Sequence, residues 1–283
     1  MAKYLPTVIE KFGKKLALLA FTDLDGTVNN QGVAEKDRLA TIAPAREAIE
    51  ILQNHGIPVG IVTARSFGET MVYQEALGAE GFTITEDGAV ILLPPNIHED
   101  IKNLSQKKHI VSHENQTALI LSEVELATIK DFLTSVTKQL EKKGLSQNIV
   151  STCTSSPQIL KELIKYQTVD DAIRAADRLA SAFVRDVAEE QYKIIIENAD
   201  SWNLRIIGKP HHAHILGKDA DKGRAIQFIN DNINLFLPEM KNIDGLLPIV
   251  FGNDYNDIRL FEEAHAMGGI GVMVKDSKGY YRV

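Results

Sequence analysis

Two aspartates with one residue between them, Asp23 and Asp25, closely follow a short apolar run at residues 16–21. Side chains at positions i and i+2 of an extended chain point to the same side, so both carboxylates can face one cleft. Carboxylates this close need a cation or a shared proton, and Mg²⁺ is the natural cation for oxygen ligands. Taken alone, the pair also fits an acidic turn without a chemical role.

Three other segments carry polar residues at corresponding places. Thr63 follows a second apolar run, Lys222 opens a predicted helix, and GNDYND at residues 252–257 follows a third apolar run. In parallel α/β sheets, functional groups gather at the carboxyl ends of the strands, so we expect these residues to meet Asp23 at one edge. Each alone has an ordinary explanation as a cap, a solvated lysine or a turn, but their occurrence in this order is hard to reach by accident.

These residue types fit phosphoryl transfer, which needs a nucleophile, a cation, donors to the phosphate oxygens and a proton shuttle. Asp23 can be the nucleophile and form an aspartyl-phosphate, while Asp25 can protonate the leaving oxygen and then activate water. Thr63 and Lys222 can bind the transferring oxygens. The acidic residues of 252–257 can complete a magnesium site.

Residues 16–93 alternate between predicted strands and helices, which is typical of a parallel α/β sheet. Ser66 can cap the second main helix, which stops at Gly78. The expected strands are 16–21, 57–62, 82–85 and 89–93, the expected helices are 7–12, 44–55 and 66–77, and the expected loop is 28–43.

The middle of the chain, from residue 96, is more polar and mixes helices with strands of an antiparallel kind. Two of these strands flank Gly208-Lys209-Pro210, which predicts a hairpin. Together they favour a separate α+β domain. The expected helices are 122–143 and 168–183, and the expected strands are 118–121, 192–196, 204–207 and 212–216.

The alternating pattern returns near residue 221. The expected elements there are a helix at 221–236, a strand at 246–251, a helix at 256–265 and a strand at 266–274. We therefore predict an α/β fold with a Rossmann-like, parallel-sheet core formed by residues 1–94 and 216–283. An α+β cap domain at residues 95–215 is inserted into this core.

The composition limits the partners. The chain has 283 residues and a formal net charge of −7, which argues against a general binder of nucleic acid or anionic membranes. Its single cysteine excludes an intrachain disulfide and favours a reducing, cytoplasmic setting. No apolar run approaches the roughly 20 residues of a membrane span. A small phosphorylated metabolite is the expected partner, and the oligomeric state is not predicted.

The sequences DLDGT, VTAR, DKG and GNDYND, in this order, resemble the four motifs of the haloacid dehalogenase (HAD) superfamily of phosphohydrolases. The long insertion between the second and third motifs resembles the branch with an α/β cap. The stretches 63–78, 85–94 and 212–226 are similar to the mannosyl-3-phosphoglycerate phosphatase family, and 176–183 is a weaker echo of its arginine-containing cap motif.

This resemblance implies Asp23 as the nucleophile and Asp25 as the acid and base. It also implies magnesium held by Asp23, the backbone carbonyl of Asp25 and an acid of the fourth motif. Asn253 stands where the family usually has Asp, so either Asn253 coordinates the metal or a later acid takes over. The candidate phosphate ligands are Thr63, Ala64, Lys222 and Asn256, and the candidate metal ligands are Asp23, Asp25, Asn253, Asp254 and Asp257.

The cap should select the substrate, because it closes over the leaving group and excludes water. Its candidate contacts to a second anionic group are Arg178, Lys209 and His211, with Arg178 first because arginine forks onto carboxylates. We expect a Mg²⁺-dependent phosphatase for a small phosphorylated sugar or sugar-acid of the mannosyl-3-phosphoglycerate kind. A phosphohexomutase is the alternative enzyme, and a non-catalytic phosphate-binding regulatory protein is a third reading, left open by Asn253.

Overall fold

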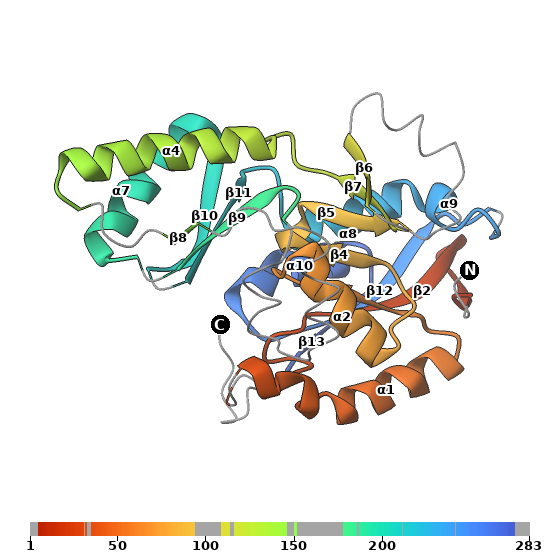
Figure 1. Cartoon of the computed structure of the whole chain (residues 1–283). Coiled ribbons are helices and arrows are strands. Elements are labelled where there is room, and N and C mark those ends of the chain that lie inside the picture. The colour runs from red at the N-terminus through yellow and green to blue at the C-terminus, as the bar shows by residue number, and fades with distance from the viewer. Residues whose placement is uncertain are drawn as a thin grey trace.

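The computed structural model describes residues 5–274, except for 31, 33–34, 94–108, 114–115, 146–149, 152–177, 186, 211 and 241. Within this part of the chain, strands form a large mixed sheet and a smaller antiparallel sheet, each covered by helices (Figure 1). We call the described part of residues 122–217, which carries the smaller sheet, the cap lobe. The remaining described residues form the core lobe.

The large sheet of the core lobe has the strand order β13-β12-β2-β3-β4-β5-β7-β6, and β1 pairs with β2 outside this path. The neighbours from β13 to β4 are parallel, and the pairs that involve β1, β5, β6 and β7 are antiparallel. The strands are β1 Val8–Lys11, β2 Lys14–Thr22, β3 Val59–Val62, β4 Thr83–Thr85, β5 Val90–Leu93, β6 His109–His113, β7 Gln116–Ile120, β12 Gly245–Gly252 and β13 Ile270–Met273.

Apolar side chains on both faces of the parallel strands explain why helices cover both sides. Phe21 of β2 packs in one cluster and its neighbour Ala20 in another, as expected from the alternation along a strand. The first cluster contains residues of α8 (Lys222–Asp231), α9 (Ile233–Phe236) and α10 (Ile258–Ala266). The second contains residues of α1 (Ala43–Asn54) and α2 (Phe67–Leu77). Each large apolar side chain buried in this way contributes about 2 kcal/mol.

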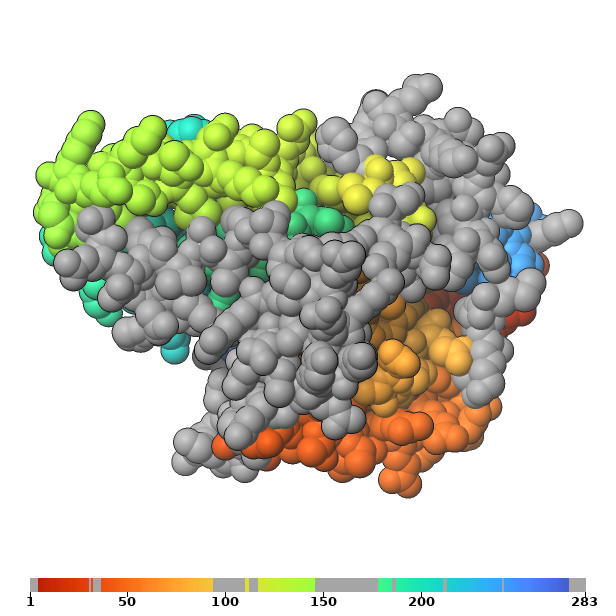
Figure 2. All heavy atoms as spheres, viewed as in Figure 1, coloured from red at the N-terminus to blue at the C-terminus, as the bar shows by residue number. Residues whose placement is uncertain are grey.

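The smaller sheet has the order β10-β11-β9-β8, and all of its pairs are antiparallel. Its strands are β8 Val150–Ser151, β9 Ser181–Arg185, β10 Leu204–Lys209 and β11 His212–Gly217. The helices α4 (Leu126–Lys142) and α7 (Glu189–Ala199) pack on it through a separate apolar cluster that includes Phe132, Ile195 and Ile215. In Figure 2, the surface of α4 lies at the top of the molecule and that of α1 at the bottom.

One carboxylate joins the two crossings of the chain between the lobes. Asp219, just after β11, accepts a hydrogen bond of 2.8 Å from the backbone N–H of Glu123 and one of 3.3 Å from the Ser122 hydroxyl. The segment that enters the cap lobe at Ser122 and the segment that leaves it at Asp219 are therefore held together. The strands β6 and β7 fall within the range 95–215 predicted for the inserted domain, yet they pair with the large sheet.

The α/β class and the Rossmann-like core, in which the strands from β13 to β4 are parallel, agree with the prediction from sequence. Residues 66–77 form the expected helix, with a complete capping box at Ser66 and left-handed Gly78 at its end. The predicted hairpin at 204–216 is present as β10 and β11.

Several elements differ from the prediction. Residues 8–11 form strand β1 instead of a helix, because they pair antiparallel with β2. Residues 192–196 lie in helix α7 instead of a strand. A 3-10 helix, Glu35–Thr41, lies in the expected loop 28–43.

Other differences concern the ends of elements. The expected helix 221–236 is divided at Asn232 into α8 and α9, and the last strand is limited to Ile270–Met273. Of the predicted helix 168–183, residues 168–177 lie outside the described residues and 181–183 belong to β9.

Candidate active site

The four segments singled out from the sequence meet at one edge of the large sheet. Asp23 follows the last residue of β2, Thr63 follows β3, and Asn253 follows β12. These are neighbouring parallel strands, so their carboxyl ends lie side by side. Lys222 is the first residue of α8, whose N-terminus lies against the same edge.

Lys222 is the centre of this cluster. Its ammonium is fully buried and donates to Asp23 Oδ1 at 2.7 Å and to Asp257 Oδ1 at 2.6 Å. Although burial favours the neutral amine, the two carboxylates raise the pKa of Lys222 above its ordinary value. Burial raises the pKa of Asp23 to about 8, and the nearby Asp257 adds to this effect. One cation therefore serves two carboxylates in a site shielded from water.

Asp25 lies in a different environment. Arg65 donates to both of its oxygens, from Nε and Nη2, each at 2.8 Å. Arg38 Nη1 at 3.2 Å and Asn29 Nδ2 at 3.0 Å add two further donors. Burial acts to raise the pKa of Asp25, but Arg65 outweighs it and holds that pKa below its usual range. Asp25 is therefore ionised in this arrangement, and it can give a proton to a leaving group only after the Arg65 pair opens.

The residues of the fourth motif have distinct partners. Asp257 Oδ2 accepts from the backbone N–H of Asn253 at 2.9 Å and of Asp254 at 3.2 Å, so this carboxylate holds the loop. Asp254 Oδ1 accepts from the N–H of Tyr255 at the start of a short 3-10 helix, Tyr255–Asp257. The buried Asn253 places Oδ1 3.3 Å from the Thr27 hydroxyl, and its Nδ2 has no hydrogen-bond partner among the described residues.

This arrangement identifies the groups that could hold a cation. Asp23 and Asn253 supply buried side-chain oxygens, while Asp257 is engaged by Lys222 and by two backbone amides. In the part of the chain that the structure describes, no cluster of three His, Cys, Asp or Glu side chains has metal-binding geometry. A hard cation here would therefore depend on a carboxylate, an amide oxygen and backbone carbonyls, which are ligands that Mg²⁺ accepts.

The candidate phosphate ligands lie around the same centre. Thr63 is buried, and its Oγ1 accepts from the N–H of Arg65 at 3.2 Å. Asn256 Nδ2 donates to Asp87 Oδ1 at 3.2 Å. The carbonyl of Ala64 faces the cap lobe, where it accepts from Arg178.

The three cap residues predicted to contact the substrate differ in burial and in whether the structure describes them. Arg178 is buried, and its two terminal nitrogens lie 3.3 and 3.4 Å from the Ala64 carbonyl, directly beside Thr63. Its guanidinium also lies 5.6 Å from the centre of the Phe183 ring. Lys209 is exposed at the end of β10. His211 lies outside the described residues.

Several residues that lie in this site were not predicted from the sequence, among them Glu86 and Asp87. Glu86 and Asp87 follow β4, and both have left-handed backbone angles, with φ of 53° and 54°. Asp87 Oδ2 lies 3.8 Å from Nδ1 of His214, a cap residue. An acidic pair followed by glycine at a strand end repeats the pattern at Asp23–Gly26, and this signal could have identified the segment.

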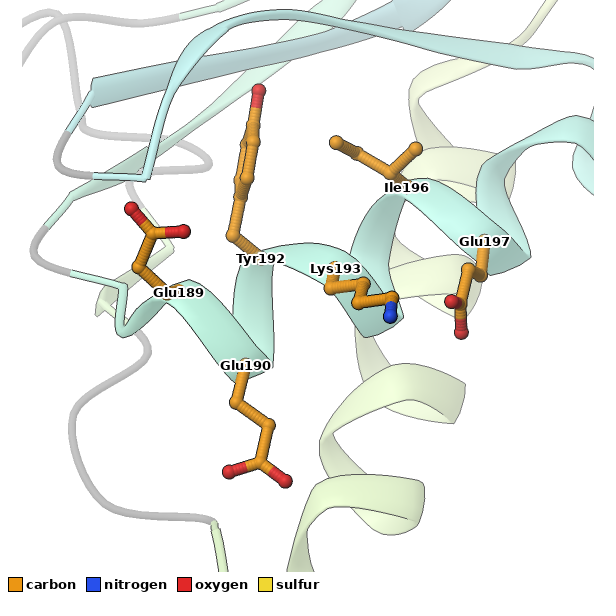
Figure 3. Close-up of a pocket in the computed structure, with 6 residues that line it drawn as sticks. All are labelled: Glu189, Glu190, Tyr192, Lys193, Ile196 and Glu197. Atoms are coloured by element: carbon orange, nitrogen blue, oxygen red, sulfur yellow. The ribbon is translucent and has the colours of Figure 1, made fainter.

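A separate surface hollow lies on the cap lobe. Its lining residues all come from α7, with Tyr192 and Ile196 directed to the same side of the helix (Figure 3). It contains none of the candidate catalytic, phosphate or metal residues. None of the described helices is both long and apolar enough to span a membrane.

The family model of haloacid dehalogenase-like hydrolases matches residues 20–279. The chain therefore belongs to this family, and it is a hydrolase.

Individual relatives agree with this assignment. A glucosyl-3-phosphoglycerate/mannosyl-3-phosphoglycerate phosphatase of Persephonella marina is 26% identical over 250 residues, which cover 87% of this chain and 82% of that protein. A protein of the same name from Methanococcoides burtonii is 23% identical, and the match covers 86% of this chain and 81% of that protein. These likenesses support a phosphatase.

Solved structures share the fold. A HAD subclass IIB sugar phosphatase superposes with a TM-score of 0.51 at 18% identity, covering 91% of this chain and 87% of that chain. A Thermoplasma acidophilum protein gives a TM-score of 0.51 at 16% identity, covering 87% and 81%.

Proposed function

We propose that this hydrolase is a Mg²⁺-dependent phosphatase that acts on a small phosphorylated sugar or sugar-acid through an aspartyl-phosphate. The observation that carries the proposal is the buried contact of Lys222 with Asp23 and Asp257 at the carboxyl ends of parallel strands. A buried carboxylate next to a fixed cation is suited to attack phosphorus while charge develops on the phosphate oxygens.

In the first step, a carboxylate oxygen of Asp23 attacks phosphorus, and the bond from phosphorus to the leaving oxygen breaks. Lys222, Thr63 and Asn256 donate to the phosphate oxygens. Asp25 gives its proton to the leaving oxygen, which requires that the carboxyl first leaves Arg65 and takes up that proton. The release of Asp25 from Arg65 is thus the step that prepares the acid.

In the second step, Asp25 removes a proton from water while the water oxygen attacks phosphorus. The acyl-phosphate bond then breaks, which returns the Asp23 carboxylate and inorganic phosphate. Asp25 acts first as the acid and then as the base, while Asp23 is the nucleophile and then the leaving group, as expected where the environments of two acids differ. The pKa of Asp23 is raised by burial, whereas the pKa of Asp25 is lowered by its paired hydrogen bonds with Arg65.

A magnesium ion fits this site, because Asp23 and Asn253 supply buried side-chain oxygens and the two carboxylates of Asp23 and Asp257 share the single positive charge of Lys222. Asp23, the backbone carbonyl of Asp25 and Asn253 would hold it, with Asp254 as the remaining candidate. When bound, the cation neutralises charge on the transferring phosphate and keeps Asp23 deprotonated. Asp257 is the least suited ligand of the predicted set, since its oxygens already hold Lys222 and the loop.

The substrate class rests on the two named relatives and on the cap. Both relatives carry names of phosphatases for glucosyl- and mannosyl-3-phosphoglycerate, and such compounds join a sugar to a carboxylate-bearing phosphate ester. Arg178 beside the Thr63–Ala64 loop offers a cation to a second anionic group, and Lys209 and His211 are further candidates.

The test is a screen of phosphorylated metabolites for release of free phosphate, with and without Mg²⁺. Asp23→Asn should lower kcat at least about 1,000-fold, because the nucleophile is lost. Asp131→Asn, an exposed change on α4, serves as the matched control and should keep full activity. Isomerisation of a hexose phosphate that needs a bisphosphate would indicate the mutase instead. Undiminished phosphate release by Asp23→Asn would contradict the proposed nucleophile.

A further inference from the structure

The turn formed by Glu86 and Asp87 faces both lobes. Both residues have positive φ, a conformation that costs about 1 kcal/mol or more for a residue with a side chain and persists only when the surroundings fix it. The backbone is fixed by hydrogen bonds from Glu86 N–H to the Arg65 carbonyl at 2.9 Å and from Asp87 N–H to the Thr63 carbonyl at 3.0 Å. The turn is thus attached to the segment that carries the candidate phosphate ligands.

The side chain of Glu86 points the other way, to the cap lobe. Its carboxylate accepts from the backbone N–H groups of Leu179 at 2.7 Å and Ala180 at 3.0 Å, and from the Ser181 hydroxyl at 2.6 Å. Glu86 is 1% exposed, and burial raises its pKa, while the neighbouring Arg178 acts to lower that pKa. A carboxylate with three donors and a nearby guanidinium is compensated well enough to remain buried.

Arg178 is the residue that these bonds position. It precedes the two amides held by Glu86, and its Nη1 donates to the Ser181 hydroxyl at 2.8 Å, which in turn donates to Glu86. The guanidinium then reaches the Ala64 carbonyl of the core lobe. Without the Glu86 contacts, segment 178–181 would lose three of the bonds that hold Arg178 beside Thr63.

We propose that Glu86 is a specificity-determining positioning residue, which docks segment 178–181 of the cap on the core and so places Arg178 next to the phosphate-binding loop. The proposal rests on the proposed function for its consequence in catalysis. Glu86 itself touches no reacting atom, and it acts through Arg178. It therefore affects substrates that reach the cap more than esters that fill only the phosphate site.

The first test uses Glu86→Gln, which keeps the shape but replaces an acceptor oxygen with an N–H₂ group that faces donors. We expect KM for mannosyl-3-phosphoglycerate to rise at least tenfold, while kcat/KM for 4-nitrophenyl phosphate falls less than threefold. Glu75→Gln, an exposed change of the same chemistry on α2, is the control. Equal losses on both esters would show a merely structural role and overturn the proposal.

The second test is a double-mutant cycle with Arg178→Lys. If Glu86 acts through Arg178, Arg178→Lys should add little to the tenfold rise in KM already caused by Glu86→Gln, so that the two effects are strongly non-additive. Independent effects that multiply would overturn the proposal.

Hydrogen exchange provides a readout that needs no substrate. The amides of Leu179 and Ala180 should exchange at least tenfold faster in Glu86→Gln than in the parent protein, with global unfolding measured in parallel to correct for stability. Unchanged local protection would overturn the docking role. If the parent protein hydrolyses no phosphate ester, the proposed function fails, and hydrogen exchange alone still decides whether Glu86 docks the cap.

Discussion

At the scale of single residues, the charge of the pocket is unbalanced. Lys222 is shared by the buried carboxylates of Asp23 and Asp257, so these three groups carry one net negative charge when all are ionised. A buried group can respond by taking up a proton or by binding a cation. Burial is the main cause of the raised pKa of Asp23, and the nearby Asp257 adds to it, so the pKa is raised even though an ammonium lies 2.7 Å away.

This imbalance predicts a pH dependence of stability in the metal-free protein. The pKa of Asp23 is about 8 in the folded state and 3.8 in its ordinary state, so the folded protein binds the extra proton between these values. The free energy of unfolding should therefore fall as the pH rises from about 4 to 8, by at most about 1.4 kcal/mol per pH unit from this group.

Urea unfolding at several pH values, with excess chelator, measures this slope. Asp23→Asn cannot titrate, so the difference between its slope and that of the parent protein isolates the contribution of Asp23. Parallel slopes for the two proteins would show that burial does not shift this carboxyl. Added Mg²⁺ should flatten the slope of the parent protein by stabilising the ionised carboxylate.

The paired hydrogen bonds from Arg65 to Asp25 lead to a second prediction. Arg65→Met removes the two shortest bonds to Asp25, and we expect the pKa of Asp25 to rise toward its ordinary value. The free energy of unfolding should fall by about 2 kcal/mol, less than for a fully buried pair because Asp25 is partly exposed. Carbon-13 NMR of the Asp25 carboxyl measures the pKa.

Arg38→Met is the matched control for this change. Arg38 makes a single contact of 3.2 Å with Asp25 and ranks last among the causes of its shifted pKa. Its loss should therefore move that pKa less than the loss of Arg65 does. The reverse order would contradict the assignment of Arg65 as the dominant partner.

The sequence predicted which polar residues meet, but not how they pair. Asp23, Thr63 and Lys222 were found because each stands at a strand end or helix start, and parallel topology brings such places together. The pairing of Asp25 with Arg65 could not be predicted. The two residues are 40 positions apart in the sequence, and their contact depends on the conformation of the arginine side chain. Glu86 was missed because its role depends on a left-handed turn and on a distant cap segment.

At the scale of elements, local preference and tertiary packing disagree in α7. Residues 192–196 contain three successive isoleucines, and β-branched residues favour strands. In the structure, Ile194 and Ile195 are buried in the cap cluster while Ile196 is about half exposed, as a helix face requires. Glu189 and Glu190 in the first turn also favour the helix through its dipole. Elements with clear capping signals, such as α2, were predicted correctly.

The close approach of the turn after β4 to the start of α8 predicts an effect of Gly88→Ala. A Cβ at Gly88 would lie 2.0 Å from the Asp221 carbonyl oxygen and 2.7 Å from the Lys222 nitrogen, and φ is +92°. Because these neighbours are backbone atoms, α8 must shift, and Lys222 must move with it. We expect a loss of about 3 kcal/mol or more in the free energy of unfolding, with reduced catalysis.

Gly78→Ala is the control for backbone conformation. Gly78 has φ of +64° at the end of α2, but a Cβ there meets nothing within 4 Å. Its cost should be limited to the left-handed conformation, about 1 kcal/mol. Denaturant unfolding of both variants separates the steric clash from this conformational cost, and similar losses would show that the contact with α8 is not tight.

At the scale of the whole molecule, each lobe has its own apolar cluster, and a further cluster joins them through Phe67 and Val90 of the core lobe and Ala180 and Leu216 of the cap lobe. Polar contacts at two places add to this packing. On one side, Glu86 binds segment 178–181. On the other, Asp219 joins the two crossings of the chain through Ser122 and the N–H of Glu123. Contacts between lobes of one chain permit relative motion unless the interface is large and hydrophobic, which would suit a cap that admits and releases substrate.

Asp219→Ala tests whether the paired crossings control this motion. The change removes both bonds from the connection while leaving the catalytic residues untouched, so each lobe should keep its own fold. We expect kcat/KM for mannosyl-3-phosphoglycerate to fall about fivefold to tenfold, because the cap samples more orientations and reaches the closed one less often. Small-angle X-ray scattering should show a broader distribution of distances, and the melting temperature should change by only a few degrees. Asp131→Ala, exposed on α4, should leave the scattering and the rate unchanged. A rate and a scattering profile that Asp219→Ala does not alter would mean that the paired crossings do not control the position of the cap.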